Sequence, residues 1–157
     1  MREPYVELAR AYGVRVEGPL LVSADGFSPR YDLDRATGII TRVGHSLYGH
    51  KLAGAIVAFP TAKGGVAAGW AFLDLQSRGL APLAFVFGIS NSVMVHGAVM
   101  AGVPIADGLT SEAWARLQTG QWAELRPAER RLRLVTRTAD RAHRSEKPPI
   151  GGEETMV

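Results

Sequence analysis

The sequence predicts an α/β domain with a small parallel or mixed central sheet flanked by helices. Residues 52–60 (LAGAIVAFP) are apolar throughout, as expected of a strand covered on both faces. Residues 66–78 follow as a helix, and Gly79 stands where a left-handed residue commonly closes a helix. Residues 81–87 (APLAFVF) have the composition of a second strand. Together they form a β-loop-α-β unit, in which ligands often bind at the loop after the first strand.

Before this unit, the sequence predicts short strands separated by turns. We expect a short helix or a loose arm at residues 1–12 and a strand at 14–22, bent at its glycine-proline pair. Residues 23–34 (SADGFSPRYDLD) are rich in turn-forming types, so an exposed loop is expected there. The composition of residues 39–43 (IITRV) predicts a further strand.

After this unit, helix and strand patterns continue to alternate. A helix capped by Ser90, Asn91 or Ser92 should run to about Gly102, and because it is apolar on every side we expect it to be buried or docked on another chain. Trp70 is expected in the core, and His96 in the core or an interface. The remaining expectations are a strand at 103–107, a short helix at 110–118 capped by Ser111, and an edge strand at 131–136.

Length and composition indicate one domain, residues 1–137, followed by a flexible basic and polar tail, residues 138–157. Apolar residues make up 46% of the chain, yet no window is apolar enough to span a membrane, and the first residues do not resemble a secretory signal. We therefore expect a cytoplasmic protein. The positive charge is concentrated near the C-terminus without interleaved aromatic residues, so no nucleic-acid partner is predicted.

The loop TAKGG (61–65) is the first candidate site. Its two glycines, Gly64 and Gly65, allow backbone N–H groups to approach a ligand, and the helix that follows presents its positive end to an anion. Lys63 adds a positive charge. The loop lacks the order of residues of a Walker A motif, and a tight turn that needs glycine only for packing is the alternative interpretation.

The loop at residues 23–34 is the second candidate site. It offers a hydroxyl at Ser28, a guanidinium at Arg30 and carboxylates at Asp25, Asp32 and Asp34. A guanidinium suits bidentate capture of a carboxylate or phosphate. In an extended backbone the Ser28 and Arg30 side chains would point the same way. Turn formation alone could also explain the composition. His45 and His50 lack a third partner at metal-binding spacing, so no metal ligand is assigned.

The segment from Asp25 to Gly65, with RGLAPLAFVF and GAVMAGVPI after the helix, resembles the small subunit, or swivelling domain, of the aconitase X family. The resemblance covers about residues 14–136 and depends on the order and spacing of four motifs. These are D-x-x-T-G at 34–38, H-x-x-x-G at 45–49, P-[ST]-G-[RK]-G at 60–64, where Ala62 replaces the first glycine, and G-x-A-P at 79–82.

The resemblance implies a β/β/α swivelling fold with a barrel-like portion that docks on a large catalytic subunit. The family dehydrates small hydroxy acids, such as cis-3-hydroxyproline and mevalonate 5-phosphate. It implies no cofactor in this chain, with any iron–sulfur cluster in the large subunit. The absence of cysteine likewise excludes a cluster ligated by cysteines of this chain. In such a reaction a base removes a proton next to a carboxylate while hydroxide leaves, helped by a Lewis acid.

One departure from the family concerns its catalytic serines, which follow the P-[ST]-G-[RK]-G motif. Residues 65–67 are Gly-Val-Ala here, so this loop offers no hydroxyl at those positions. Ser28 and Thr61 are therefore the candidate catalytic residues. Arg30, Lys63, Gly64 and Gly65 are the candidate substrate-binding residues. Two alternatives stay open: a non-catalytic binding or regulatory module, and a homo-oligomeric enzyme with a different reaction.

Overall fold

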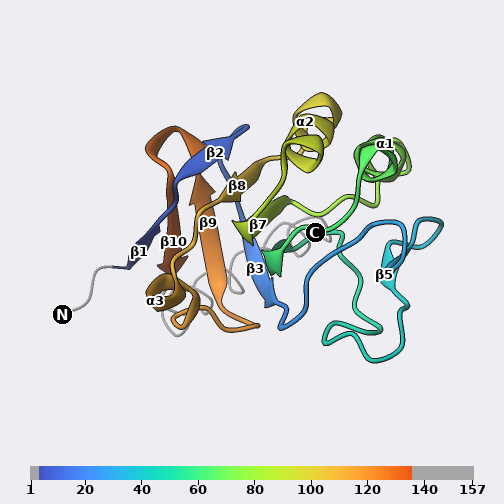
Figure 1. The fold of residues 1–157 in the computed structure, drawn as a ribbon. Coiled ribbons are helices and arrows are strands. Elements are labelled where there is room, and N and C mark those ends of the chain that lie inside the picture. The colour runs from blue at the N-terminus through green and yellow to red at the C-terminus, as the bar shows by residue number, and fades with distance from the viewer. Residues whose placement is uncertain (1–3, 136–157) are drawn as a thin grey trace, which may run out of the picture.

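The computed structural model describes residues 4–135, and an eight-stranded mixed sheet forms its frame (Figure 1). The order across the sheet is β1-β10-β9-β3-β6-β7-β8-β2. Its strands are β1 (Tyr5–Glu7), β2 (Arg10–Tyr12), β3 (Val16–Val22), β6 (Ile56–Thr61), β7 (Ala84–Ile89), β8 (Ile105–Asp107), β9 (Trp122–Arg126) and β10 (Arg131–Val135). The neighbours β3, β6, β7 and β8 run parallel, and the other pairings are antiparallel.

Helices cover both faces of this sheet, which confirms the predicted α/β class. The helices are α1 (Val66–Ser77), α2 (Ser92–Ala101), the short α3 (Ser111–Trp114) and the 3₁₀ turn η1 (Pro127–Glu129). Figure 1 shows α1 and α2 together on one side, and α3 on the other. A separate two-stranded sheet pairs β4 (Leu33–Asp34) with β5 (Ile39–Ile40).

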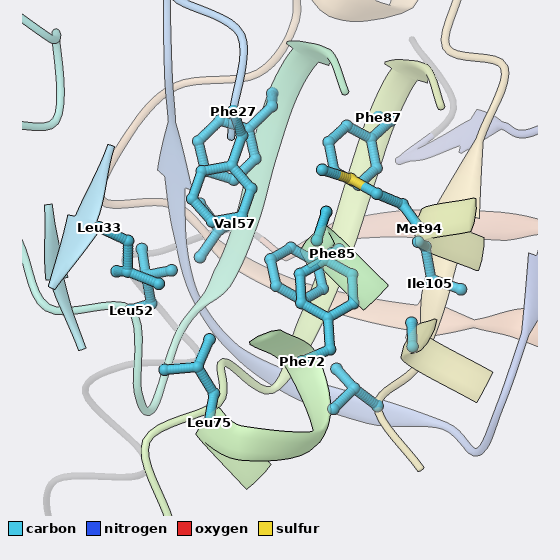
Figure 2. Close-up of a cluster of buried hydrophobic side chains, with 14 of the residues drawn as sticks. Phe27, Leu33, Leu52, Val57, Phe72, Leu75, Phe85, Phe87, Met94 and Ile105 are labelled. Atoms are coloured by element: carbon cyan, nitrogen blue, oxygen red, sulfur yellow. The ribbon is translucent and has the colours of Figure 1, made fainter. Parts of the chain in front are cut away.

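Strands β6 and β7 are apolar along their length because alternate residues enter two different cores. Val57 and Phe59 of β6, with Phe85 and Phe87 of β7, pack under α1 and α2. The residues between them pack with β3, β9 and β10 on the opposite face. All five phenylalanines of the chain belong to the core under α1 and α2, where Phe27 stacks on Phe59 with ring centroids 4.4 Å apart (Figure 2). The structure therefore confirms the prediction that these strands are covered on both faces.

Helices α1 and α2 cross at two glycines. A Cβ atom built on Gly97 of α2 would lie 2.5 Å from the Cα atom of Gly69 in α1, so the two backbones are in contact. This crossing turns Trp70 outward, and its side chain is 66% exposed, contrary to the core position expected for it. Trp70 and Met100 border a hollow of about 600 Å³ between the helices.

The predicted helix over residues 92–102 is α2. Asn91 caps it by accepting the Met94 N–H at 2.8 Å, and Gly102 closes it in the left-handed region, as predicted. One face of α2 is buried, while Val99 and Met100 are exposed. His96 is also exposed, which excludes the core position, while the expected interface position stays a prediction. Docking of the exposed face on another chain stays a prediction.

The first two strands close the sheet on itself. β1 pairs with β10 at one end of the strand order, and β2 pairs with β8 at the other end. Only Leu8 and Ala9 separate β1 from β2, and their N–H groups donate to Arg130 and Asp107 carbonyls at 2.9 Å. The two edges of the sheet therefore meet at this connection, which gives the barrel-like portion that the resemblance implies.

Several sequence expectations for short elements are corrected. The described part of residues 1–12 forms strands β1 and β2 rather than a helix or arm, because its residues fill both open edges of the sheet. β10 lies between β1 and β9 and is therefore not an edge strand. Strand β9 was not predicted. The strand expected at 39–43 is only two residues long, as β5. Thr110, rather than Ser111, caps α3. The tail at 138–157 lies outside the described residues.

Candidate functional site

The candidate site lies beyond the carboxyl ends of the parallel strands β3 and β6. The loops that follow these strands continue the pairing, with a parallel bridge between Phe27 and Ala62. The Phe27 N–H donates to the Thr61 carbonyl at 3.0 Å, and the Lys63 N–H donates to the Phe27 carbonyl at 2.9 Å. Because the Phe27 ring is fully buried in the core, it fixes the loop that carries Ser28 against the loop that carries Lys63.

A surface hollow of about 540 Å³ opens between these loops. It is lined by Ser28, Tyr31, Arg42, Lys63 and Gly64. Ser28 is 5% exposed, so its hydroxyl lies at the floor, whereas Lys63 and Arg42 are exposed. Among the described residues, no carboxylate or other group forms an ion pair or hydrogen bond with the Lys63 side chain. The hollow therefore has two cationic side chains, of which Lys63 makes no ion pair with any described residue.

Glycines shape the wall of the hollow at two positions. Gly64 has φ of +118°, and a Cβ atom there would lie 3.2 Å from the Ala68 Cβ atom. A Cβ atom on Gly26 would lie 2.5 Å from Thr61 Oγ1 and 2.8 Å from Lys63 Cε, so the Lys63 side chain passes directly over Gly26. Glycine at both positions therefore lets the two loops lie close together.

Gly65 differs from Gly64 in its backbone and in its surroundings. It is the N-cap of α1, has φ of −116°, and makes no side-chain cap. A Cβ atom on Gly65 would meet nothing within 4 Å. No capping side chain therefore covers the first N–H groups of α1. Helix α1 begins two residues after Gly64, and the N-terminus of a helix favours anions.

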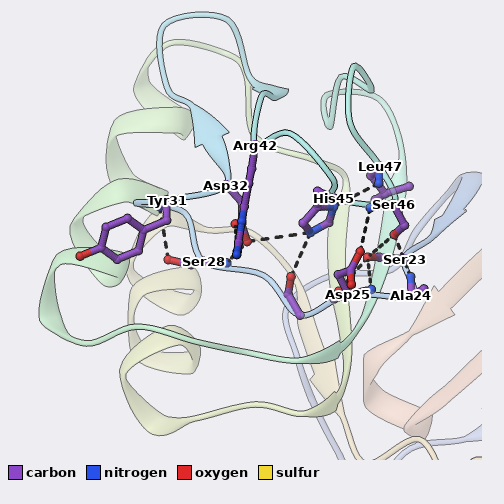
Figure 3. A network of polar contacts seen from close by, with 11 residues as sticks. Ser23, Ala24, Asp25, Ser28, Tyr31, Asp32, Arg42, His45, Ser46 and Leu47 are labelled. Atoms are coloured by element: carbon purple, nitrogen blue, oxygen red, sulfur yellow. Dashed lines mark hydrogen bonds and ion pairs between the residues drawn. The ribbon is translucent and has the colours of Figure 1, made fainter.

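Behind the hollow, a buried carboxylate connects two loops (Figure 3). Asp32 has no exposed surface, accepts the Ser28 N–H at 2.8 Å and accepts from Arg42 Nη1 at 3.0 Å. Its backbone carbonyl accepts the N–H groups of Thr41 and Arg42, and its own N–H donates to the Ser28 carbonyl at 2.9 Å. Asp32 thus fixes the position of Ser28 and anchors Arg42 at the rim.

His45 completes this buried network. Its Nδ1 atom accepts the Leu47 N–H at 3.1 Å, so the proton of the neutral ring resides on Nε2, which donates to the Gly26 carbonyl at 3.0 Å. The Nε2 atom lies 3.9 Å from Asp32 Oδ2, too far for a hydrogen bond. His45 therefore supports the glycine over which Lys63 passes and does not face the hollow.

The structure brings together three of the six predicted site residues: Ser28, Lys63 and Gly64 line the hollow. Thr61 and Gly65 do not line it, although both lie in the adjoining loop. Arg30 does not line it either, because residues 28–32 form a turn rather than an extended strand. The Arg30 guanidinium stacks over the Tyr31 ring at 5.3 Å, so the expectation that Ser28 and Arg30 point the same way is wrong.

The sequence interpretation missed Arg42 and Tyr31, and it named Asp32 as one of three carboxylates in the loop without assigning it a role. Arg42 was placed inside an expected strand at 39–43, but β5 ends at Ile40 and the chain then bends towards Asp32. The available signal was a basic residue shortly after the apolar pair at residues 39–40. The loop that precedes this pair contains several aspartates with which it could form an ion pair. Among the described residues, no group of three or more His, Cys, Asp and Glu side chains could hold a metal ion.

Comparison with known proteins decides the family. The model described as "Aconitase X swivel domain" matches residues 7–134. The chain belongs to the aconitase X swivel-domain family. The crystal structure of Thermococcus kodakaraensis aconitase X in its holo-form superposes with a TM-score of 0.79 at 25% identity, covering 85% of this chain and 99% of that one. The solution structure of a UPF0107 protein gives a TM-score of 0.77 at 26% identity, covering 84% and 99%.

Two relatives of this aconitase X swivel domain have functional names. The phosphomevalonate dehydratase small subunit of Thermococcus gammatolerans is 30% identical over 126 residues, covering 80% of this chain and 94% of the relative. The protein of the same name from Methanocella arvoryzae is 32% identical over 111 residues, covering 71% and 84%. The family resemblance drawn from the four motifs is therefore confirmed. Among the described residues, no helix is long and apolar enough to cross a membrane.

Proposed function

We propose that this swivel domain is the small subunit of an aconitase X-type hydro-lyase that dehydrates a small hydroxy acid. The observation that carries the proposal is the similarity, over most of the chain, to small subunits of phosphomevalonate dehydratases. Mevalonate 5-phosphate is therefore the first substrate to test. Its carboxylate and phosphate are both anions, which suits a hollow containing Lys63 and Arg42.

In this proposal the domain binds and orients one anionic group of the substrate. Lys63 attracts it, the N–H groups at the start of α1 lie beside it, and the Ser28 hydroxyl donates a hydrogen bond from the floor. Asp32 fixes the Ser28 backbone, so the hydroxyl is positioned before the substrate arrives. The hollow is open on one side, and the proposal places the large subunit over that opening.

The proton next to the carboxylate is removed by a base of the large subunit. This assignment follows from residues 65–67, which are Gly-Val-Ala and have no hydroxyl. The chain has no cysteine, so any iron–sulfur cluster is assigned to the large subunit as well. Such a cluster, when bound, supplies a Lewis acid for the departing hydroxide.

Co-expression with the aconitase X-type large subunit of the same organism tests this proposal. We expect a stable complex that contains iron and converts mevalonate 5-phosphate to its dehydrated product. Ser28→Ala should weaken substrate binding by about tenfold to a hundredfold, the effect of losing one hydrogen bond to a charged group. A complex that forms but dehydrates neither mevalonate 5-phosphate nor cis-3-hydroxyproline would refute the assigned reaction.

The alternative of a non-catalytic binding module is favoured by the same missing hydroxyls at residues 65–67. It predicts that the purified chain binds a small anion without a partner and that adding the large subunit produces no turnover. A homo-oligomeric enzyme instead predicts turnover by this chain alone. Size-exclusion chromatography with light scattering, followed by an activity assay on each peak, separates these outcomes.

A further inference from the structure

Arg42 stands at the rim of the hollow in an arrangement that leaves most of its donors open. Its side chain is 53% exposed, and its Nη1 atom is 3.0 Å from Oδ1 of the fully buried Asp32. A guanidinium has five N–H donors in a planar fork. Among the described residues, Asp32 is the one group that the Arg42 side chain binds. The remaining donors are therefore available at a surface that Arg42 shares with Lys63 and Ser28.

Backbone hydrogen bonds join the two loops in addition to the ion pair. The backbone N–H groups of Thr41 and Arg42 already donate to the Asp32 carbonyl, at 2.9 and 3.3 Å. The Asp32 carboxylate is also bound by the Ser28 N–H at 2.8 Å. What the ion pair adds is a fixed position for the guanidinium, since an unpaired arginine at the surface would sample many rotamers.

We propose that Arg42 is a second cationic ligand for an oxyanion in the hollow, and that Asp32 is the residue that positions it. Lys63 acts as a point charge on one loop, and the Arg42 fork binds two oxygens of the same phosphate or carboxylate from the other. The charges of Arg42, Lys63 and Asp32 sum to +1, so the hollow still attracts an anion after the ion pair has formed. The identity of the full substrate rests on the proposed function; the oxyanion site does not.

Inorganic phosphate is the probe for the purified chain, with acetate as the carboxylate probe. Titrations followed by the amide resonance of Gly64 should saturate for wild type, and Arg42→Lys should weaken the affinity about tenfold because it keeps the charge but loses the fork. Tighter binding of phosphate than of acetate assigns the site to the phosphate group, and the reverse order assigns it to a carboxylate. Equal affinities in wild type and Arg42→Lys, or no saturable shift with either probe, would overturn the proposal.

Arg78→Lys is the matched control. Arg78 also binds one carboxylate, at 2.9 Å from Asp74, and its side chain is 48% exposed, but it lies at the far end of α1. This variant should bind phosphate as wild type does. In the reconstituted complex, Arg42→Lys should raise KM for mevalonate 5-phosphate about tenfold while kcat stays within about twofold, a split that a merely structural role would not produce.

A measurement on the unchanged protein covers the case in which Arg42→Lys does not fold. Phenylglyoxal modifies exposed arginines, and mass spectrometry locates the label. Phosphate should slow the labelling of Arg42 and leave that of Arg78 unchanged. Equal labelling of Arg42 with and without saturating phosphate would contradict the proposal. Because no step of these two assays requires turnover, they decide the role of Arg42 even when the dehydratase assay fails.

Discussion

Replacing Gly97 with alanine should force helices α1 and α2 apart, whereas the same change at Gly69 should not. A Cβ atom on Gly97 would lie 2.5 Å from the Cα atom and 2.9 Å from the carbonyl oxygen of Gly69. The obstacle is helix backbone, which cannot rotate away as a side chain can. A Cβ atom on Gly69 would lie 3.4 Å from the Val93 carbonyl oxygen, an ordinary contact.

The two variants should change stability in opposite directions. Alanine in place of glycine inside a helix gains about 1 kcal/mol from propensity. Overpacking typically costs about 1–3 kcal/mol, and a clash with backbone lies at the upper end of that range. Gly97→Ala should therefore lose about 1–2 kcal/mol of unfolding free energy, and Gly69→Ala should gain up to about 1 kcal/mol.

Urea titration followed by circular dichroism measures both changes on the same chain. For a domain of this size each kcal/mol corresponds to roughly 2–4 °C in Tm, so thermal unfolding gives a second estimate. The m-value should stay constant if only the native packing has changed. A Gly97→Ala variant as stable as wild type, or two variants that shift in the same direction, would refute the close crossing of the helices.

Three further predictions concern the loop after β6. Gly64→Ala should lower the free energy of unfolding by about 1 kcal/mol or more in urea titration, because Gly64 has φ of +118°. Gly65→Ala should lower it less, because Gly65 has φ of −116°. Equal losses would contradict this difference between the two backbone conformations. Lys63→Ala should leave Tm within about 2 °C of wild type, because Lys63 makes no described ion pair. The lost positive charge should weaken phosphate binding about tenfold. A large fall in Tm with unchanged phosphate binding would show that Lys63 is structural. Gly65→Ser should fold normally, because a Cβ atom at this position meets open space. The variant should not raise kcat of the complex. A tenfold gain in kcat would instead locate the missing base at residue 65.

The parallel core of the fold was predictable because its signals are local. β6 and β7 are continuous apolar runs, α1 lies between them, and Asn91 and Gly102 mark both ends of α2 by side-chain and backbone chemistry that a sequence displays. Strands β1 and β2 were missed because their stability comes from partners far away in the chain. β1, for example, is three residues long and exists only through β10. Strand β9 was also missed, although β10 follows it closely and pairs with it.

The candidate site was predictable where its geometry follows from glycine and strand order. Gly64 and Lys63 lie at the end of a parallel strand, where a ligand is expected. Arg42 was missed and Arg30 does not line the hollow, because the direction of each side chain depends on the turn at residues 28–32 and on the buried carboxylate of Asp32. Neither the turn nor the burial of one aspartate among several is encoded by spacing alone.

The closure of the sheet by β1 and β2 has a consequence for how the chain is made. Strands β1 and β2 leave the ribosome well before their partners, because β2 pairs with residues 105–107 and β1 with residues 131–133. The ion pair between Glu7 and Arg131 spans 124 positions, a delay of roughly 6–25 s at ordinary rates of translation. During that interval the backbone groups of these two segments have no native strand with which to pair. The barrel therefore closes late, around a parallel core that is already complete in the nascent chain, because β1 and β2 are made well before the strands with which they pair.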